Sequence, residues 1–189
     1  MKHLLIILLL FTGCQQKTKV TAVDYLEVQS ALAKDNFVTN FSEKSIHQRG
    51  GPGINLIWLA KPNVHFFVID SNDVESERRC KRELLESFAR HSIELDNVQA
   101  DSIIADLRRL ISFMKKYSIS HESYVGTSSK RMSYFIDFGL SQHEYLRYFH
   151  NEEVQNIIYP ENVIEAKWID SSWVYLKEKS VKDTVSVRY

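Results

Sequence analysis

Histidine side chains are the groups in this chain best suited to acid–base or metal chemistry. Six of the seven histidines lie beyond the apolar start of the chain, at His47, His65, His91, His121, His143 and His150. His121-Glu122 begins like the zinc-binding HExxH motif, but no second histidine follows four residues after the first. The six also lack the spacing of structural zinc ligands. The sequence therefore predicts neither a metal nor a cofactor, and it identifies no catalytic residue.

Cys80 is the one internal thiol, and it lies in the basic run Arg78–Arg82. Nearby cations favour the thiolate, so a redox or nucleophilic cysteine is one interpretation. At roughly 100° per residue, however, Cys80 falls at the edge of the apolar stripe of a helix. That stripe consists of Leu84, Leu85 and Phe88. The pattern therefore favours a small, half-buried residue on a basic helix.

The tryptophans Trp58, Trp168 and Trp173 are the candidate ligand-binding residues. Aromatic side chains can line a groove for a carbohydrate or a peptide. All three fall in strand-like segments, where packing in the core is the ordinary alternative. By alternation, Trp173 and Tyr175 share one face of their strand.

The first residues of the chain predict export from the cytoplasm. Met1-Lys2-His3 is a short basic start, and Leu4–Phe11 is wholly apolar. At about 1.5 Å per residue this run covers roughly 12 Å, too little to span a bilayer core about 30 Å thick. Its length is typical of the apolar region of a signal peptide. Thr12-Gly13-Cys14 follows directly, and the chain then turns polar at Gln15.

At these residues the chain resembles a bacterial lipoprotein precursor. Thr12 and Gly13 match the pattern before the cysteine, whereas Phe11 stands where leucine is usual. The resemblance covers about fourteen residues and implies that Cys14 carries diacylglycerol through a thioether. It also implies cleavage of residues 1–13, with Cys14 as the first residue of the mature protein.

The resemblance has consequences for location and partners. Two or more acyl chains give stable anchoring in one leaflet. Gln15 stands where an aspartate would favour retention in the inner membrane, so we expect the outer membrane, facing the periplasm, if the host has two membranes. The expected partners are the membrane, through the anchor, and another envelope protein, a peptide or a glycan.

Composition excludes one class of partner. The chain balances 24 basic against 24 acidic side chains and has no overall electrostatic footprint for nucleic acid. Once Cys14 is acylated, Cys80 has no partner for an intramolecular disulfide. Residues 14–22 form the lipidated cysteine and a short polar tether, and residues 23–189 are expected to form a single α+β domain.

Periodicity places helices between hairpins. Residues 23–34 are predicted to be weakly helical, residues 76–92 form a helix capped by Asn72 or Asp73, and residues 101–117 form a strongly amphipathic helix. Before this pair, residues 54–60 and 64–70 have the pattern of a hairpin. The second of these runs is almost entirely apolar, which predicts a central strand.

Strand patterns return after the helices. Residues 123–127 and 132–138 are predicted to form a hairpin, and residues 163–169, 173–178 and 184–189 a C-terminal meander. Ile164, Ala166 and Trp168 alternate onto one face of the first meander strand. Between hairpin and meander, Ser141 and Glu144 have the spacing of a capping box. That spacing predicts a short helix carrying Tyr145, Tyr148 and Phe149.

The sequence thus predicts a lipid-anchored α+β protein with a mostly antiparallel sheet. The favoured function is binding or interaction rather than catalysis. The alternatives are an envelope hydrolase, whose histidines and carboxylates converge only in the fold, and a membrane-tethered immunity or inhibitor protein. An exposed aromatic or apolar patch would favour the binding module, and a concave pocket with converging histidines and carboxylates the enzyme.

Overall fold

A computed structural model describes residues 24–48, 53–71, 73–126, 134–150 and 162–180. Its eight strands form one antiparallel sheet in the order β3-β2-β1-β4-β5-β6-β8-β7. The strands are β1 (Lys44–Gln48), β2 (Ile54–Leu59), β3 (Val64–Ile69), β4 (His121–Gly126), β5 (Tyr134–Gly139), β6 (Glu144–Phe149), β7 (Val163–Trp168) and β8 (Trp173–Glu178). The predicted fold class, α+β with a mostly antiparallel sheet, is confirmed.

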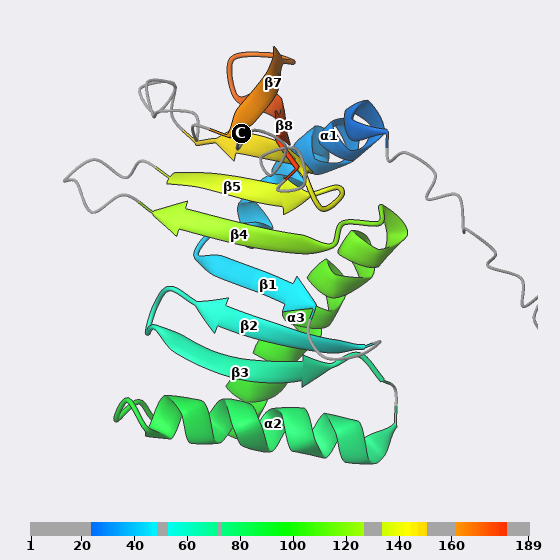
Figure 1. Ribbon diagram of the computed structural model, residues 1–189. Helices are drawn as coiled ribbons and strands as arrows, with labels where there is room; N and C mark the ends of the chain where they lie inside the picture. Colours follow the sequence, from blue (N-terminus) through cyan, green and yellow to red (C-terminus); the bar gives the residue numbers. More distant parts are fainter. Residues whose placement is uncertain (1–23, 49–52, 72, 127–133, 151–161, 181–189) are drawn as a thin grey trace, which may run out of the picture.

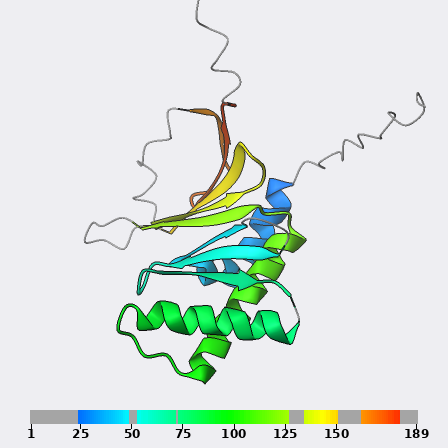
Figure 2. The same ribbon diagram turned by 60° about the horizontal axis from the view of Figure 1, so that its bottom comes forward.

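The helices lie behind the sheet and along one of its edges. They are α1 (Tyr25–Ala33), the 3₁₀ helix η2 (Lys34–Phe41), α2 (Val74–Ala89) and α3 (Asn97–Lys116). Figure 1 shows α1 and α3 behind the strands and α2 running beside β3. Figure 2 shows from a second direction that the other face of the sheet carries no helix among the described elements.

Each α-helix begins after an aspartate whose carboxylate accepts backbone N–H groups. Asp24 accepts from Leu26, and Asp73 caps α2 by accepting from Ser76 at 2.8 Å. Asp96 forms a reciprocal capping box with Gln99, so α3 starts four residues before the predicted position. The cap at Asp73 confirms one of the two predicted residues.

The chain builds the sheet from two groups of strands. β1, β2 and β3 form a meander, and α2 and α3 then carry the chain back across the sheet. β4 pairs with the free side of β1, in the register Ile46↔Glu122 and His47↔His121. The strands β5, β6, β8 and β7 continue outward from β4.

The prediction that the second strand of the first hairpin is central was wrong, because β3 is an edge strand of the described sheet. Val64, Phe66 and Val68 are buried while His65 and Phe67 are exposed. The sequence of β3 is almost entirely apolar although the strand lies at the edge of the sheet, and α2 covers that outer edge. From α2, the Ser87 hydroxyl donates to the His65 carbonyl at 3.0 Å.

Cys80 belongs to this cover over the edge of β3. Its Sγ lies 3.0 Å from the Ile69 backbone nitrogen and accepts that N–H. The side chain is 1% exposed, so it is fully buried rather than half-buried as expected. The thiol therefore has a structural role, because it satisfies an amide that an edge strand leaves unpaired.

The prediction of a short helix after Ser141 was also wrong. Residues Glu144–Phe149 form β6, which pairs with β5 and β8. The Ser141 hydroxyl does donate to Glu144 Oε2 at 3.3 Å, but this contact belongs to the turn before a strand. Aromatic residues are enriched in strands, and here they pack on both neighbouring strands.

The predicted C-terminal hairpin is confirmed, since β7 and β8 pair antiparallel. Asp170 Oδ1 accepts the backbone N–H groups of Ser172 and Trp173 and so closes the turn. The prediction that Ile164 shares one face of this strand with Ala166 and Trp168 was wrong. A bulge between Val163 and Glu165 interrupts the alternation at that residue. Residues 184–189 lie outside the described residues.

A carboxylate is buried inside the core at the junction of β1 and β4. Glu122 is 0% exposed, and neither of its carboxylate oxygens has a hydrogen-bond partner among the described residues. The nearby Lys44 ammonium instead donates to the carbonyls of Asn40 and Ser42. Burial raises the pKa of Glu122 well above its ordinary value, against the opposing effects of the Ile46 amide and Lys44.

We expect Glu122→Gln to stabilise the protein at pH 8. Folding raises the pKa of this carboxyl, so the protonated group imposes no charge-burial cost below its unfolded pKa of about 4.3. The free energy of unfolding then decreases as the pH rises above that value, because the unfolded state ionises more readily than the folded one. The glutamine amide has the same shape and no charge, so it removes this loss. The free energy of unfolding should increase by about 1–3 kcal/mol at pH 8 and change little at pH 4. Urea unfolding of both proteins at the two pH values measures the difference.

Glu94→Gln is the matched control, because Glu94 is exposed on the connection between α2 and α3. That control should leave the free energy of unfolding within experimental error at both pH values. An equal or lower stability of Glu122→Gln at pH 8 would contradict the assignment of a costly buried carboxyl.

Candidate functional site

The face of the sheet opposite the helices is the candidate functional surface, and we call it the open face. Strand pairing fixes which side chains share it, because residues directly opposite one another in a ladder point to the same side. The register places on this face Ser45, His47, Leu56, Trp58, His65, Phe67, His121, Ser123, Phe135, Asp137, Tyr145, Arg147 and Phe149.

One end of the open face is apolar, and we call this region the hairpin patch. It consists of the three cross-strand pairs of β2 and β3: Ile54 with Ile69, Leu56 with Phe67, and Trp58 with His65. Ile54 is 36% exposed and Phe67 is 43% exposed. None of the six carries a carboxylate, an ammonium or a guanidinium group. Such a contiguous apolar surface is typical of interaction sites.

Trp58 is held rigidly within the hairpin patch. Its indole N–H donates to Asn63 Oδ1 at 2.8 Å, and its ring stacks on His65 with centroids 6.3 Å apart. The indole donor is therefore already used inside the protein. Trp58 presents an apolar ring face to a ligand and offers no hydrogen bond.

The middle of the open face is polar. His47 and His121, paired across β1 and β4, stack with ring centroids 5.7 Å apart and an interplanar angle of 9°. The Ser123 hydroxyl lies 3.3 Å from His47 Nε2. The fold thus brings together two histidines that the sequence shows only as scattered residues.

His121 is positioned by the residue that faces it on β5. Gly139 leaves the space that the imidazole fills, because a Cβ at that position would lie 2.1 Å from His121 Cε1. The Ser120 hydroxyl donates to the Gly139 carbonyl at 3.1 Å, and its oxygen also lies 3.1 Å from His121 Nδ1. Burial lowers the pKa of His121, against the opposing charge of Asp137. The lowered pKa favours the neutral imidazole near pH 7.

Asp137 and Arg147 form a buried ion pair beside the histidines. Arg147 Nε and Nη2 donate to the two carboxylate oxygens at 2.7 and 2.9 Å, and the guanidinium lies 4.2 Å from the Phe135 ring centroid. Burial raises the pKa of Asp137, and Arg147 opposes that shift. Because this carboxylate binds a guanidinium rather than an imidazole, Ser123, His47 and Asp137 do not form a serine-hydrolase relay.

The three candidate tryptophans do not converge. Trp58 lies in the hairpin patch, whereas Trp168 is 43% exposed on β7 at the far end of the sheet and stacks on Phe149. Trp173 is 3% exposed and packs in the core against Tyr148 and Phe138. Trp58 is thus the candidate that joins a larger apolar surface. The predicted lipidation residue, Cys14, lies outside the described residues.

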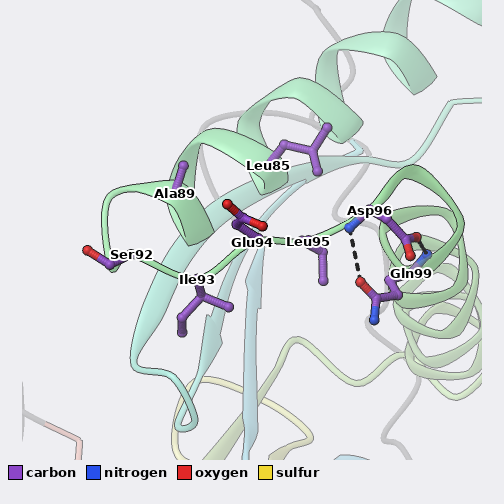
Figure 3. Close-up of a pocket in the computed structure, with 8 residues that line it drawn as sticks. All are labelled: Leu85, Ala89, Ser92, Ile93, Glu94, Leu95, Asp96 and Gln99. Atoms are coloured by element: carbon purple, nitrogen blue, oxygen red, sulfur yellow. Dashed lines mark hydrogen bonds between the residues drawn. The ribbon is translucent and has the colours of Figure 1, made fainter.

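A hollow of about 940 Å³ lies on the helix side, between the end of α2 and the start of α3. Figure 3 shows its lining residues, Leu85, Ala89, Ser92, Ile93, Glu94, Leu95, Asp96 and Gln99. Asp96 and Gln99 bond to each other's backbone in the capping box of α3. Their polar groups are therefore used to begin a helix, and no histidine is among the described residues that line the hollow.

Two searches of the described ranges bear on chemistry and location. No three histidine, cysteine, aspartate or glutamate side chains in them are grouped so that they could hold a metal ion. No helix in the same ranges has the length and hydropathy needed to cross a bilayer.

We expect Gly139→Ala to displace the His121 imidazole. The new methyl group would overlap the ring and approach Ser120 Oγ, at a cost of about 1–3 kcal/mol. The pKa of His121 should rise towards its ordinary value as the ring becomes more exposed. Urea unfolding and a histidine titration followed by NMR measure the two effects. In a His121→Ala background the same change should cost less, because only the contact with Ser120 Oγ remains, and an unchanged cost there would contradict the proposed contact with the ring.

Comparisons with known proteins attach no family to this geometry. No protein-family model, curated protein or solved structure matches the chain.

Proposed function

We propose that this is a lipid-anchored protein of the cell envelope that binds a partner protein through its open face. The observation that carries the proposal is the hairpin patch, where uncharged, partly exposed side chains cover one end of a sheet face on which no described helix packs. Burying apolar surface is the main favourable term in protein association, at about 25 cal/mol per Å².

A partner protein fits the patch better than a glycan does. Glycan recognition needs polar groups beside an aromatic platform, and the Trp58 indole N–H is already bonded to Asn63. Aliphatic residues such as Ile54 and Leu56 complete the surface instead. A protein whose apolar side chains are exposed on one face would complement it. Inhibitor or immunity activity would be one form of such binding.

The hydrolase alternative is less well supported. The fold does gather His47, His121 and Ser123, but the neighbouring Asp137 is held by Arg147 in a bidentate pair. The imidazoles therefore act better as part of a recognition surface, where they border the hairpin patch across β1 and β2.

The location part of the proposal rests on the start of the chain. Leu4–Phe11 and Thr12-Gly13-Cys14 resemble a lipoprotein signal, and α1 begins at Tyr25, only eleven residues beyond Cys14. A tether of that length would keep the open face close to the membrane surface. In a host with two membranes, Gln15 favours the outer membrane, with the protein facing the periplasm.

The anchor is tested by mass spectrometry of the mature protein from its native host. We expect an N-terminal peptide that begins at Cys14 and carries acyl mass, and accumulation of the precursor when lipoprotein signal peptidase is inhibited. Cys14→Ser should abolish both results. Cys80→Ser should preserve them, because that thiol is buried under α2. An unmodified Cys14 in the wild-type protein would sink the anchoring proposal.

The binding face is tested with a photo-crosslinking phenylalanine analogue placed at Phe67 in living cells. We expect one discrete adduct, and Ile54→Lys should lower its yield roughly tenfold because it adds a charge to the patch. The matched control position is Val98, which is 77% exposed on α3. The same adduct from position 98, or a yield that Ile54→Lys leaves unchanged, would refute the assignment.

A further inference from the structure

The two edge strands of the described sheet, β3 and β7, differ in whether a helix covers them. α2 covers β3, where Ser87 and Cys80 bond to backbone groups of the strand. At the other edge, β7 is paired with β8 alone within the described part of the chain. Two large apolar side chains of β7 are exposed there, Ile164 at 60% and Trp168 at 43%. An open edge of this kind can pair with another strand.

The hydrogen-bond pattern of the hairpin identifies the backbone groups at this open edge. The Ile169 N–H donates to the Trp173 carbonyl at 2.9 Å, which marks that pair as a hydrogen-bonded one. Hydrogen-bonded pairs alternate along an antiparallel ladder, so Lys167 and Glu165 also bond towards β8. Ala166 and Trp168 therefore direct their N–H and C=O groups away from the sheet.

The order of side chains along β7 is self-complementary. The strand reads Ile164, Glu165, Ala166, Lys167, Trp168, with an acid and a base equidistant from a central alanine. In an antiparallel pair centred on Ala166, each Glu165 lies opposite Lys167 of the second copy. Ile164 is the bulged residue and lies outside this regular alternation. The outward N–H and C=O groups of the two central alanines face each other in this register.

We propose that β7 pairs antiparallel with β7 of a second copy of this chain, about a twofold axis at Ala166. The pairing joins two eight-stranded sheets edge to edge and leaves both open faces available. Directly opposed charges and main-chain hydrogen bonds supply the specificity.

Charge selects this register over its neighbours. An axis at Lys167 would oppose two ammonium groups, and an axis at Glu165 would oppose two carboxylates, both of which are unfavourable. Lys167 Nζ now lies 2.7 Å from Glu165 Oε1 of its own strand, with both side chains exposed. Pairing exchanges this contact for two between chains and buries no unpaired charge. A lysine ordinarily protects an edge strand, but here its opposite neighbour is acidic.

The proposed interface is small, so its affinity in solution is weak, and anchoring in a membrane would increase the fraction of paired molecules. The bulge at Val163–Glu165 limits the regular ladder to about three residues a side, so the buried area is far below the roughly 1,600 Å² of a standard interface. Confinement to one leaflet raises the local concentration and strengthens such a weak contact. The extent of pairing depends on the proposed lipid anchor. The register does not, because it follows from the residues of β7 alone.

The test is disulfide trapping of the full-length Ala166→Cys protein in native membranes under mild oxidant. Residues opposite each other in a hydrogen-bonded pair have Cα atoms about 5.5 Å apart, within the range of a disulfide. We expect a covalent dimer from Ala166→Cys and none from Val98→Cys, a control on α3 that is exposed as Ala166 is. Wild-type protein run alongside detects any dimer formed through an unmodified Cys14, which would count against the anchor and not against the pairing.

Charge exchange in the Ala166→Cys background decides the register. Glu165→Lys and Lys167→Glu should each reduce the trapped dimer severalfold, because each places like charges opposite one another. The double variant restores opposite charges in the same register, so it should recover the dimer. The proposal is overturned if Ala166→Cys forms no more dimer than Val98→Cys, if it joins a different protein instead, or if the double variant fails to recover.

Discussion

The pairing of β1 with β4 is the interaction on which the remaining structure depends. It joins strands that are separated in the chain by β2, β3, α2 and α3, and it turns two groups of strands into one sheet. On the helix side this junction carries Ile46 and Glu122, in the deepest part of the core. On the open side it carries His47 and His121. The buried Glu122 carboxyl and the stacked imidazoles thus share one short ladder.

Much of the fold could be predicted from periodicity alone. The hairpin of β2 and β3 and the amphipathic helix α3 have strong local patterns, and both are present. The segment of β6 fits two patterns. Tyr145, Tyr148 and Phe149 have the spacing of a helix face, which led to the wrong prediction, whereas Tyr145, Arg147 and Phe149 have the alternation of a strand. A local pattern cannot separate these alternatives. The deciding fact is that β5 and β8 lie on either side of the segment.

The candidate site was harder to predict, because its parts meet only through register. Trp58 could be singled out from its type, and it does belong to the hairpin patch. The contact of His121 with Gly139 and the ion pair of Asp137 with Arg147 depend on which residues lie opposite each other across strands. A glycine inside a strand was the one local signal of a close approach, and it does not say which side chain approaches.

The cover that α2 places over β3 limits how copies of this protein can assemble. Fibres and amyloid grow because every added molecule presents a fresh strand edge to the next one. Here one of the two edges is occupied within the same chain by Ser87 and Cys80. A molecule with a single available edge can join one neighbour at most through its sheet. Within the described sheet, edge-to-edge association is therefore limited to a pair of molecules.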